Sequence, residues 1–185
     1  MIYKHNGSII TDIGGKWLSH SDTPTPPTLE EITIGTQTWT KYNLNYDDGL
    51  GGVHIVNDVV DIRDNHHYGT QYYYTWDAAV RIANSIEGWH LPSNSEYITL
   101  IQYDPGFGGD DQWYLLDVIP VGYELYESGV YSTGDIGDYG YFWSSTASNS
   151  EVNRLKVSNT GDSIDLGGVS HTTPYYYSVR LIKDT

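Results

Sequence analysis

The sequence predicts an α+β fold in which two short helices lie between runs of β-strands. Two segments place apolar side chains at helical spacing, whereas the segments around them alternate or are rich in β-branched residues. A turn at residues 88–93, Gly-Trp-His-Leu-Pro-Ser, joins the two helical segments. Its glycine suits the positive φ that ends a helix, its proline cannot lie inside the next helix, and Ser93 with Glu96 forms a capping box. This order of elements is typical of an α+β domain.

The length of 185 residues suits one domain with a full core and a short additional segment. Residues 1–20 predict a small β element that is too short to fold alone, and we expect it to be a docking segment. Residues 21–29 form a proline-rich, extended linker. The main domain is therefore expected over residues 30–185.

The first half of the main domain predicts strands followed by two helices. Residues 32–39 alternate and predict a strand, with a turn possible at Gly35, and the β-branched residues 53–62 predict a hairpin arm. A helix is expected over residues 76–87, with Thr75 as its cap and Gly88 after its end. A second helix is expected over residues 94–102, with Tyr97, Leu100 and Ile101 facing inward.

The second half predicts further strands. Residues 104–111 form a loop rich in Asp and Gly, and residues 112–131 show no clear period. Residues 141–146 predict a strand with two different faces, and residues 152–157 and 163–169 predict the arms of a hairpin. Residues 177–182 alternate and predict a last strand. We expect Trp76, Trp89 and Trp143 to pack near one another in the core.

The net charge of −15 at pH 7 argues against nucleic acid and against an anionic membrane surface as partners. A neutral or cationic partner, such as a glycan or another protein, fits this charge better. The chain has no cysteine, which excludes disulfides, Cys-ligated metal and a cysteine nucleophile. No apolar run is long enough to insert into a membrane, and the first residues lack the apolar core of a signal peptide.

No group of residues indicates catalysis, so we expect neither an enzyme nor a bound cofactor. His66 and His67, near Asp61 and Asp64, are expected to lie in a solvated turn rather than to bind a metal. The aspartates in the loop at residues 104–111 lack the ligand spacing of a standard calcium loop. His90 is expected to be a hydrogen-bonded structural histidine. A hydrolase that uses the aspartate-rich loops remains a third hypothesis for function.

A polar surface near the C-terminus is the remaining candidate for a site. Between Thr146 and Tyr177 the chain is dense in Ser, Asn, Asp, Thr and Tyr, which bind through adaptable hydrogen bonds and flat aromatic contacts. Ordinary polar decoration of an exposed sheet is the alternative. If the hairpin arms lie side by side, the candidate ligand-binding residues are Ser148, Asn149, Ser150, Asn153, Asp162, Asp165, His171, Tyr175 and Tyr176.

Five motifs occur along the chain in a recognisable order. They are Trp39 with residues 43–46 (Asn-Leu-Asn-Tyr), residues 74–79 (Tyr-Thr-Trp-Asp-Ala-Ala), the turn at residues 88–93 with Glu96, residues 140–146 (Gly-Tyr-Phe-Trp-Ser-Ser-Thr), and residues 178–180 (Ser-Val-Arg). In this combination residues 30–184 resemble the Fibrobacter succinogenes major paralogous domain, a family similar to the C-type lectin fold. The resemblance implies two helices around a small twisted antiparallel sheet. It also implies that the strand at residues 32–39 lies near the final strand, and that the C-terminal part carries a ligand face.

The chain departs from this family pattern at several points. Ser85 and Leu181 stand where family members often have cysteines, so the bridge between helix and strand is missing. The calcium-lectin signatures Glu-Pro-Asn and Trp-Asn-Asp are also absent, which argues against calcium-dependent sugar binding. The formylglycine-generating relatives of this fold need cysteine, so their chemistry is excluded.

The sequence favours a noncatalytic binding module, in a tail or head fibre of a phage particle, that recognises a bacterial surface glycan or protein. Residues 1–20 would contact other virion proteins. The alternatives are a structural virion protein without a host ligand and an adhesin on a bacterial surface. The ligand, the host and the association of several copies are left open.

Overall fold

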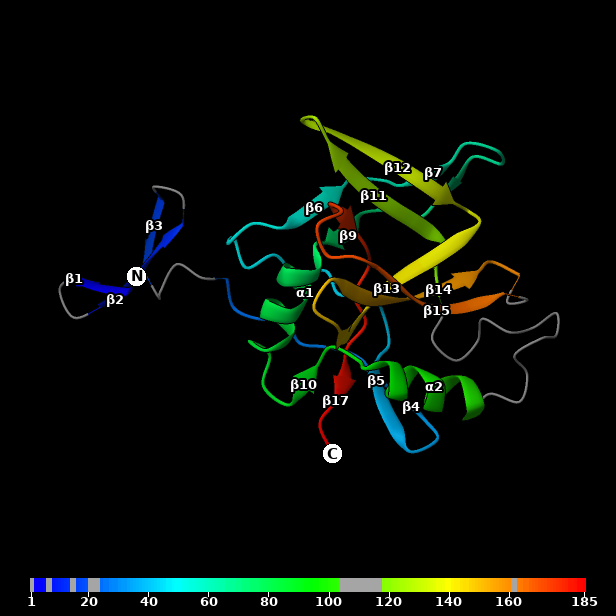
Figure 1. Ribbon diagram of the computed structural model, residues 1–185, viewed down its shortest axis with the longest axis horizontal. Coiled ribbons are helices and arrows are strands. Elements are labelled where there is room, and N and C mark those ends of the chain that lie inside the picture. Colours follow the sequence, from blue (N-terminus) through cyan, green and yellow to red (C-terminus); the bar gives the residue numbers. More distant parts are fainter. Residues whose placement is uncertain (1, 6–7, 14–15, 20–23, 104–117, 161–162) are drawn as a thin grey trace.

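The computed structural model describes residues 2–5, 8–13, 16–19, 24–103, 118–160 and 163–185 of the chain. This described part contains seventeen strands and two short helices, and the strands form several separate sheets (Figure 1). The predicted α+β fold of the C-type lectin type is therefore wrong, because the chain is mostly β-sheet rather than a small sheet between two helices. The sequence-based prediction overlooked strands that are short, or exposed on both faces, and that consequently lack a clear alternation.

The N-terminal segment forms a sheet of its own. Its strands are β1 (Ile2–His5), β2 (Ser8–Ile13) and β3 (Lys16–Ser19), paired antiparallel in the order β1-β2-β3. Figure 1 shows this sheet apart from the rest of the described chain. A β element was predicted here, whereas its role as a docking segment remains a prediction.

A sheet of four strands joins the beginning of the main domain to the C-terminus. It contains β4 (Glu31–Ile34), β5 (Gln37–Thr40), β10 (Trp89–His90) and β17 (Ile182–Lys183), in the order β10-β17-β5-β4. Ile182 lies opposite Trp39, so the expected meeting of the first and last strands of the domain is confirmed. Gly35 turns the hairpin with a φ of 61°, and a side chain there would collide with the ring of Tyr103.

Along the chain, four short strands that form two small sheets come between this hairpin and the first helix. One pairs β6 (Val53–Val56) with β9 (Gln71–Tyr74), and the other pairs β7 (Val60–Asp61) with β8 (His66–His67). The predicted hairpin arm at residues 53–62 therefore consists of two strands with partners in different sheets. Asp58, between them, has a positive φ of 62°, which interrupts the strand.

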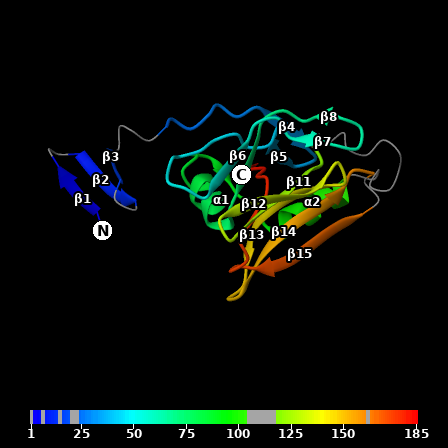
Figure 2. The ribbon, with the colours of Figure 1, turned by 90° about the horizontal axis from the view of Figure 1, so that it is seen from above.

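The largest sheet contains six strands. They are β11 (Val121–Glu127), β12 (Val130–Ile136), β13 (Tyr139–Ala147), β14 (Glu151–Ser158), β15 (Ile164–Ser170) and β16 (Tyr175–Tyr176). Five follow the order β12-β11-β13-β14-β15, and β16 pairs with β11. Figure 2 shows β13, β14 and β15 running alongside α2, the second helix. The predicted hairpin of β14 and β15 is confirmed, whereas β11 and β12 were not predicted.

The two helices begin where the sequence predicts. Helix α1 (Trp76–Ala83) is capped by the Thr75 hydroxyl, which accepts a hydrogen bond from the Ala78 amide at 3.2 Å. Helix α2 (Asn94–Tyr103) follows the capping box, in which the Ser93 amide donates to Glu96 Oε2 at 2.7 Å. Within the described ranges, neither helix is long and apolar enough to cross a membrane.

Helix α1 ends four residues earlier than predicted. The chain after Ala83 continues as tight turns, in which the Ser85 and Ile86 amides each donate to the carbonyl three residues earlier. The Ser85 hydroxyl also donates to the Ile82 carbonyl at 2.7 Å. Serine competes for backbone carbonyls in this way, which explains why the apolar period outlasts the helix.

Two apolar clusters lie on opposite faces of β13 and β14. One contains Tyr141, Trp143 and Val152 together with residues of α1, and the other contains Phe142 and Leu155 together with residues of α2. Trp89 and Trp143 are buried in the first cluster and Trp76 packs against it. Trp76, Trp89 and Trp143 thus belong to the same apolar cluster, and the sheet has two distinct sides.

Candidate binding site

A pocket of about 240 Å³ lies at the beginning of α1. Trp76 and Asp77 line it from the helix, Trp143 and Val152 from β13 and β14, and residues 171–175 from the turn after β15 and the start of β16. It therefore combines apolar walls with a small number of polar groups, as ligand pockets commonly do. We call it the Trp76 pocket.

The orientation of Trp76 is fixed by the backbone of β13. Its indole Nε1 donates to the Ser144 carbonyl at 2.8 Å, and its side chain packs against the first apolar cluster. The ring meets the imidazole of His171 edge to face, with 5.3 Å between the ring centroids. Trp76 therefore presents a held, half-buried aromatic surface to the pocket.

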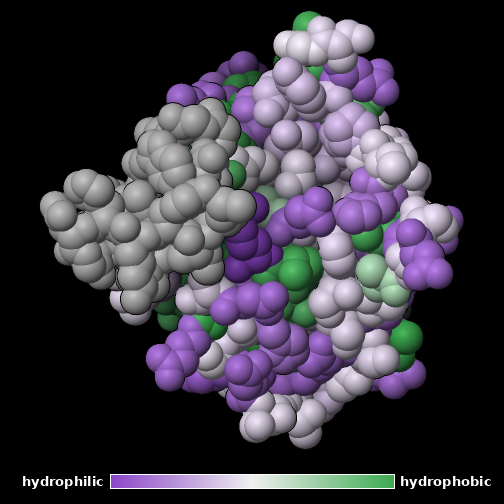
Figure 3. Space-filling view, turned by 60° about the vertical axis from the view of Figure 1, so that its left-hand side comes forward, coloured by the Kyte–Doolittle hydropathy of each residue, from purple (hydrophilic) through white to green (hydrophobic). Residues whose placement is uncertain are grey.

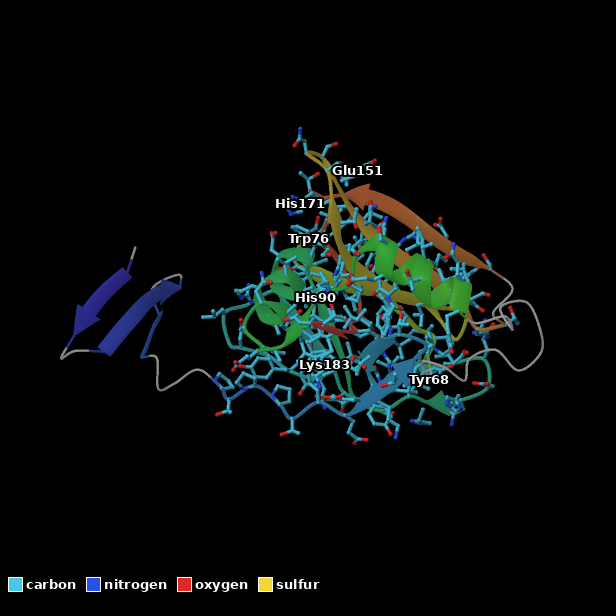
Figure 4. All side chains as sticks on the ribbon, turned by 90° about the horizontal axis from the view of Figure 1, so that it is seen from below. Tyr68, Trp76, His90, Glu151, His171 and Lys183 are labelled. Atoms are coloured by element: carbon cyan, nitrogen blue, oxygen red, sulfur yellow. The ribbon has the colours of Figure 1, made fainter. Side chains whose placement is uncertain are left out.

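The polar groups of the pocket lie at its rim. Nε2 of His171 is 3.1 Å from Oδ1 of Asp77, and both side chains are exposed to solvent. Thr172 and Thr173 supply hydroxyl groups beside this pair. Figure 4 shows His171, Trp76 and Glu151 at the same end of the molecule, away from Lys183. The rim thus offers one acid, one imidazole and two hydroxyls to a ligand that forms hydrogen bonds.

The structure brings five of the nine candidate residues to this end of the molecule. His171 and Tyr175 line the Trp76 pocket. Ser148, Asn149 and Ser150 form the exposed turn between β13 and β14, and the Ser150 carbonyl accepts a hydrogen bond from the His171 amide at 3.1 Å.

The other candidates do not join one patch. Asp165 lies on the same face of the sheet, where it pairs with Arg154, but Asn153 faces the opposite side. Lys156 of β14 lies opposite Asp165 and therefore shares its face. Successive side chains of a strand alternate between faces, so Asn153, three positions from Lys156, points to the other face. Tyr176 turns from the pocket toward His54 and Tyr131. Asp162 lies outside the described residues. The expectation of a single continuous patch is therefore wrong, because Asn153 faces the opposite side of the sheet and Tyr176 turns away from the pocket.

The sequence-based prediction missed the contribution of α1. The helical spacing of Trp76 predicts a core residue, and no sequence pattern indicates Asp77, Thr172 or Thr173 as site residues. Trp76 is the first residue of α1, so no preceding helical turn covers its ring, and part of the ring remains exposed. That position, followed directly by an aspartate, is the local signal that could have identified this side of the pocket.

His66 and His67 are exposed, as expected, but they form the short strand β8 rather than part of a turn. His67 Nδ1 is 2.7 Å from Asp58 Oδ2 at the surface, and His66 lies against the ring of Tyr68. Among the described residues there is no group of three or more His, Asp or Glu side chains that could hold a metal ion. The loop at residues 104–111, which contains Asp104, Asp110 and Asp111, lies outside the described residues.

His90 links the central turn to α2 and to the C-terminus. Its Nε2 lies 2.8 Å from Glu96 Oε1, and its Nδ1 lies 2.6 Å from Asp184 Oδ1. Burial lowers the pKa of His90, but hydrogen bonds to these two carboxylates and their charges outweigh burial and raise it above its usual value. The predicted hydrogen-bonded structural histidine is confirmed.

A second, wider pocket of about 320 Å³ lies beside Asp61 and Arg63. Oδ1 and Oδ2 of Asp61 accept hydrogen bonds from Nε and from the terminal nitrogen of Arg63 at 2.9 and 2.6 Å. Asp138 also pairs with this guanidinium at 2.5 Å. Because its cation is already shared by two acids, this pocket offers less to an incoming ligand than the Trp76 pocket does.

We expect the Arg63→Gln variant to titrate Asp61 at higher pH than the wild type. Side-chain and backbone hydrogen bonds from Arg63 lower the pKa of Asp61 from 3.8 to about 2. The resulting stabilisation is present above pH 3.8 and is lost as the pH falls through about 2. Carbon-detected NMR titration of the Asp61 carboxyl group measures this pKa directly, and an identical midpoint in the two proteins would contradict the role of Arg63.

Comparisons with known proteins identify no relative of this chain. No protein-family model matches the chain. No curated protein matches it, and no solved structure matches it. The resemblance to the Fibrobacter succinogenes major paralogous domain therefore stays a prediction from sequence motifs, and the functional proposal depends on the site of this chain.

Proposed function

We propose that this protein is a noncatalytic carbohydrate-binding module and that the Trp76 pocket holds a sugar unit of its ligand. The observation that carries the proposal is the half-buried indole of Trp76, held at Ser144 and surrounded by the polar rim of Asp77, His171, Thr172 and Thr173. A sugar ring has a face of C–H bonds and a rim of hydroxyl groups. The first suits an aromatic surface and the second suits paired donors and acceptors.

The charge of the molecule narrows the kind of carbohydrate. With a net charge of −15, the chain repels polyanions, so a neutral or cationic glycan suits it better than an acidic one. Figure 3 shows a face on which hydrophobic side chains reach the surface only in small, separate areas. Such a surface favours a ligand that is bound through hydrogen bonds and contacts with aromatic rings over a ligand that buries a broad apolar area.

The biological setting that we propose is an adhesion protein of a phage particle that recognises a bacterial surface glycan. The polar and aromatic character of the pocket supports a glycan ligand. The neighbouring genes test the setting independently of the ligand. Neighbours that encode virion proteins would support it, and neighbours that encode only metabolic enzymes would contradict it.

Replacing Trp76 by alanine is expected to abolish most glycan binding. Truncation of a central tryptophan anchor costs about 2 kcal/mol or more, which corresponds to a roughly thirtyfold weaker Kd. The measurement is binding of the purified chain to an array of bacterial surface glycans, followed by titration calorimetry with each glycan that binds. The matched control is Asn153→Ala, which removes a late polar residue on the opposite face of β14. Equal losses in both variants, or no loss in the Trp76 variant, would contradict the assignment of the pocket.

A further inference from the structure

A row of aromatic and charged side chains extends from the Trp76 pocket along the same face of the large sheet. Because side chains two positions apart share a face of a strand, Tyr139, Tyr141 and Trp143 of β13 lie on one side. Arg154 and Lys156 of β14 lie opposite Trp143 and Tyr141, on this side as well. Trp143 also lines the Trp76 pocket, so the row is continuous with it.

Two further tyrosines connect the row to the other side of the pocket. Tyr175 lines the pocket and meets the ring of Tyr123 edge to face, with 5.6 Å between the centroids. Tyr123 in turn meets Tyr141 in the same way at 5.3 Å. We call the set of Tyr123, Tyr139, Tyr141, Tyr175, Arg154 and Lys156 the tyrosine face.

The tyrosine face is reachable from solvent. Tyr123, Tyr139 and Tyr175 are half-buried, whereas Tyr141 is almost fully buried and forms its floor. Gly167 of β15 lies opposite Arg154 and contributes no side chain, so that Arg154 reaches across it to Asp165 at 2.9 Å. The face is therefore a shallow aromatic surface with charged groups along one edge.

The two cations of this face are already matched by acids. Arg154 pairs with Asp165, and Lys156 Nζ lies 3.8 Å from Asp135 and 3.6 Å above the centre of the Tyr139 ring. Neither cation therefore brings an unneutralised charge to hold a carboxylate or phosphate of a ligand. What the face offers is ring surface, together with donors and acceptors that suit hydroxyl groups.

We propose that the tyrosine face is a second part of the binding site, which takes the following units of an uncharged oligosaccharide chain whose first unit lies in the Trp76 pocket. This inference rests on the proposed carbohydrate-binding function. It assigns the ligand class as a polymer of neutral sugars rather than a single sugar. The unbroken series of ring contacts from Tyr175 through Tyr123 and Tyr141 to Tyr139 is the observation that carries it.

The test is an array that presents each neutral bacterial glycan backbone as a short and as a long fragment of defined length. The wild-type chain is expected to bind the long fragments about tenfold more tightly than the short ones, since additional aromatic contacts form. Tyr139→Ala is expected to remove this advantage while leaving the binding of the short fragments unchanged.

A second variant keeps the test valid if Tyr139→Ala does not fold. Gly167→Gln keeps every ring but adds a side chain to the face, and the nearest atoms to its new Cβ belong to the flexible side chains of Asp165 and Arg154, at 3.1 and 3.5 Å. It is expected to lose the preference for long fragments as well. Asn153→Ala on the opposite face is the control that should retain the preference.

Three outcomes separate this inference from the proposed function. Loss of the length preference in both face variants supports the second part of the site. Wild-type binding that does not depend on length, or a preference that both variants retain, overturns it and leaves the function of the Trp76 pocket intact. If the wild type binds no glycan of any length, the proposed function itself fails.

Discussion

Replacing Trp143 by alanine is expected to lower the free energy of unfolding by about 3 to 5 kcal/mol, the usual effect of removing a large aromatic side chain from a core. Trp143 is 1% exposed, and its ring centroid lies 4.2 Å from that of Tyr177. Its indole Nε1 donates to the Tyr74 carbonyl at 2.6 Å, so the change also removes one of the two hydrogen bonds that this carbonyl accepts, and the one from the Tyr177 amide at 3.0 Å remains. A domain at the lower end of the usual range of stability, about 5 kcal/mol, would be close to unfolding.

Urea denaturation followed by circular dichroism measures this effect. Tyr42→Ala is the control, because it truncates an aromatic ring that is 46% exposed, and it should change the stability by about 0.5 kcal/mol or less. A loss below about 1 kcal/mol for Trp143→Ala would mean that the first apolar cluster does not hold the fold.

Replacing Arg180 by methionine is expected to cost about 3 to 5 kcal/mol, because the change removes the donor to three neutral acceptors and each buried acceptor left unsatisfied costs about 1 to 3 kcal/mol. Arg180 is 1% exposed. Its guanidinium donates to Asn43 Oδ1 at 2.7 Å, to the Thr40 carbonyl at 3.0 Å, and to the Lys41 carbonyl. It thereby ties the C-terminal segment to the chain that follows β5.

The control for Arg180 is another basic residue near the C-terminus. Lys183 forms an ion pair with Glu31 at 2.6 Å, but both side chains are more than two-fifths exposed. Lys183→Met should therefore cost at most about 1 kcal/mol. Similar losses for the two variants in thermal and urea unfolding would show that the buried network of Arg180 contributes no more than a surface pair.

Local features of the fold were predictable because the groups that form them are close in sequence. The Thr75 cap and the box of Ser93 and Glu96 each join residues three positions apart, and both occur as predicted. The hairpin of β14 and β15 was predictable because polar turn residues separate two alternating segments.

The fold class was not predictable in the same way. Strand β12 is exposed over its first four residues, so burial imposed no alternation on its sequence. For the C-terminal segment the sequence pattern was misleading in the opposite way, because it alternates where burial does not. Residues 177–182 alternate in polarity, yet all six are buried, because Ser178 and Arg180 are enclosed as well as Val179 and Leu181. The helices gave the strongest periodic signal, so their share of the structure was overestimated.

The binding site could not be predicted from the sequence, because its residues come together only in the folded chain. His171 and Asp77 are 94 positions apart in sequence, and their meeting forms the rim of the Trp76 pocket. Composition identified His171 and Tyr175 as candidates, but it could not assign Asn153 and Asp165 to opposite faces, since that depends on the strand register. The motifs in the family resemblance do meet in space, for instance where Trp143 donates to the Tyr74 carbonyl and Arg180 to Asn43.

The most direct test of the carbohydrate site is a two-dimensional NMR titration that follows the indole N–H signals of the six tryptophans while a glycan selected by the array is added. We predict that the Trp76 signal shifts in proportion to occupancy, because its ring lines the pocket. The signal of Trp39, which is fully buried in the second apolar cluster, should stay in place. Saturable glycan binding that leaves the Trp76 signal unmoved would contradict the account.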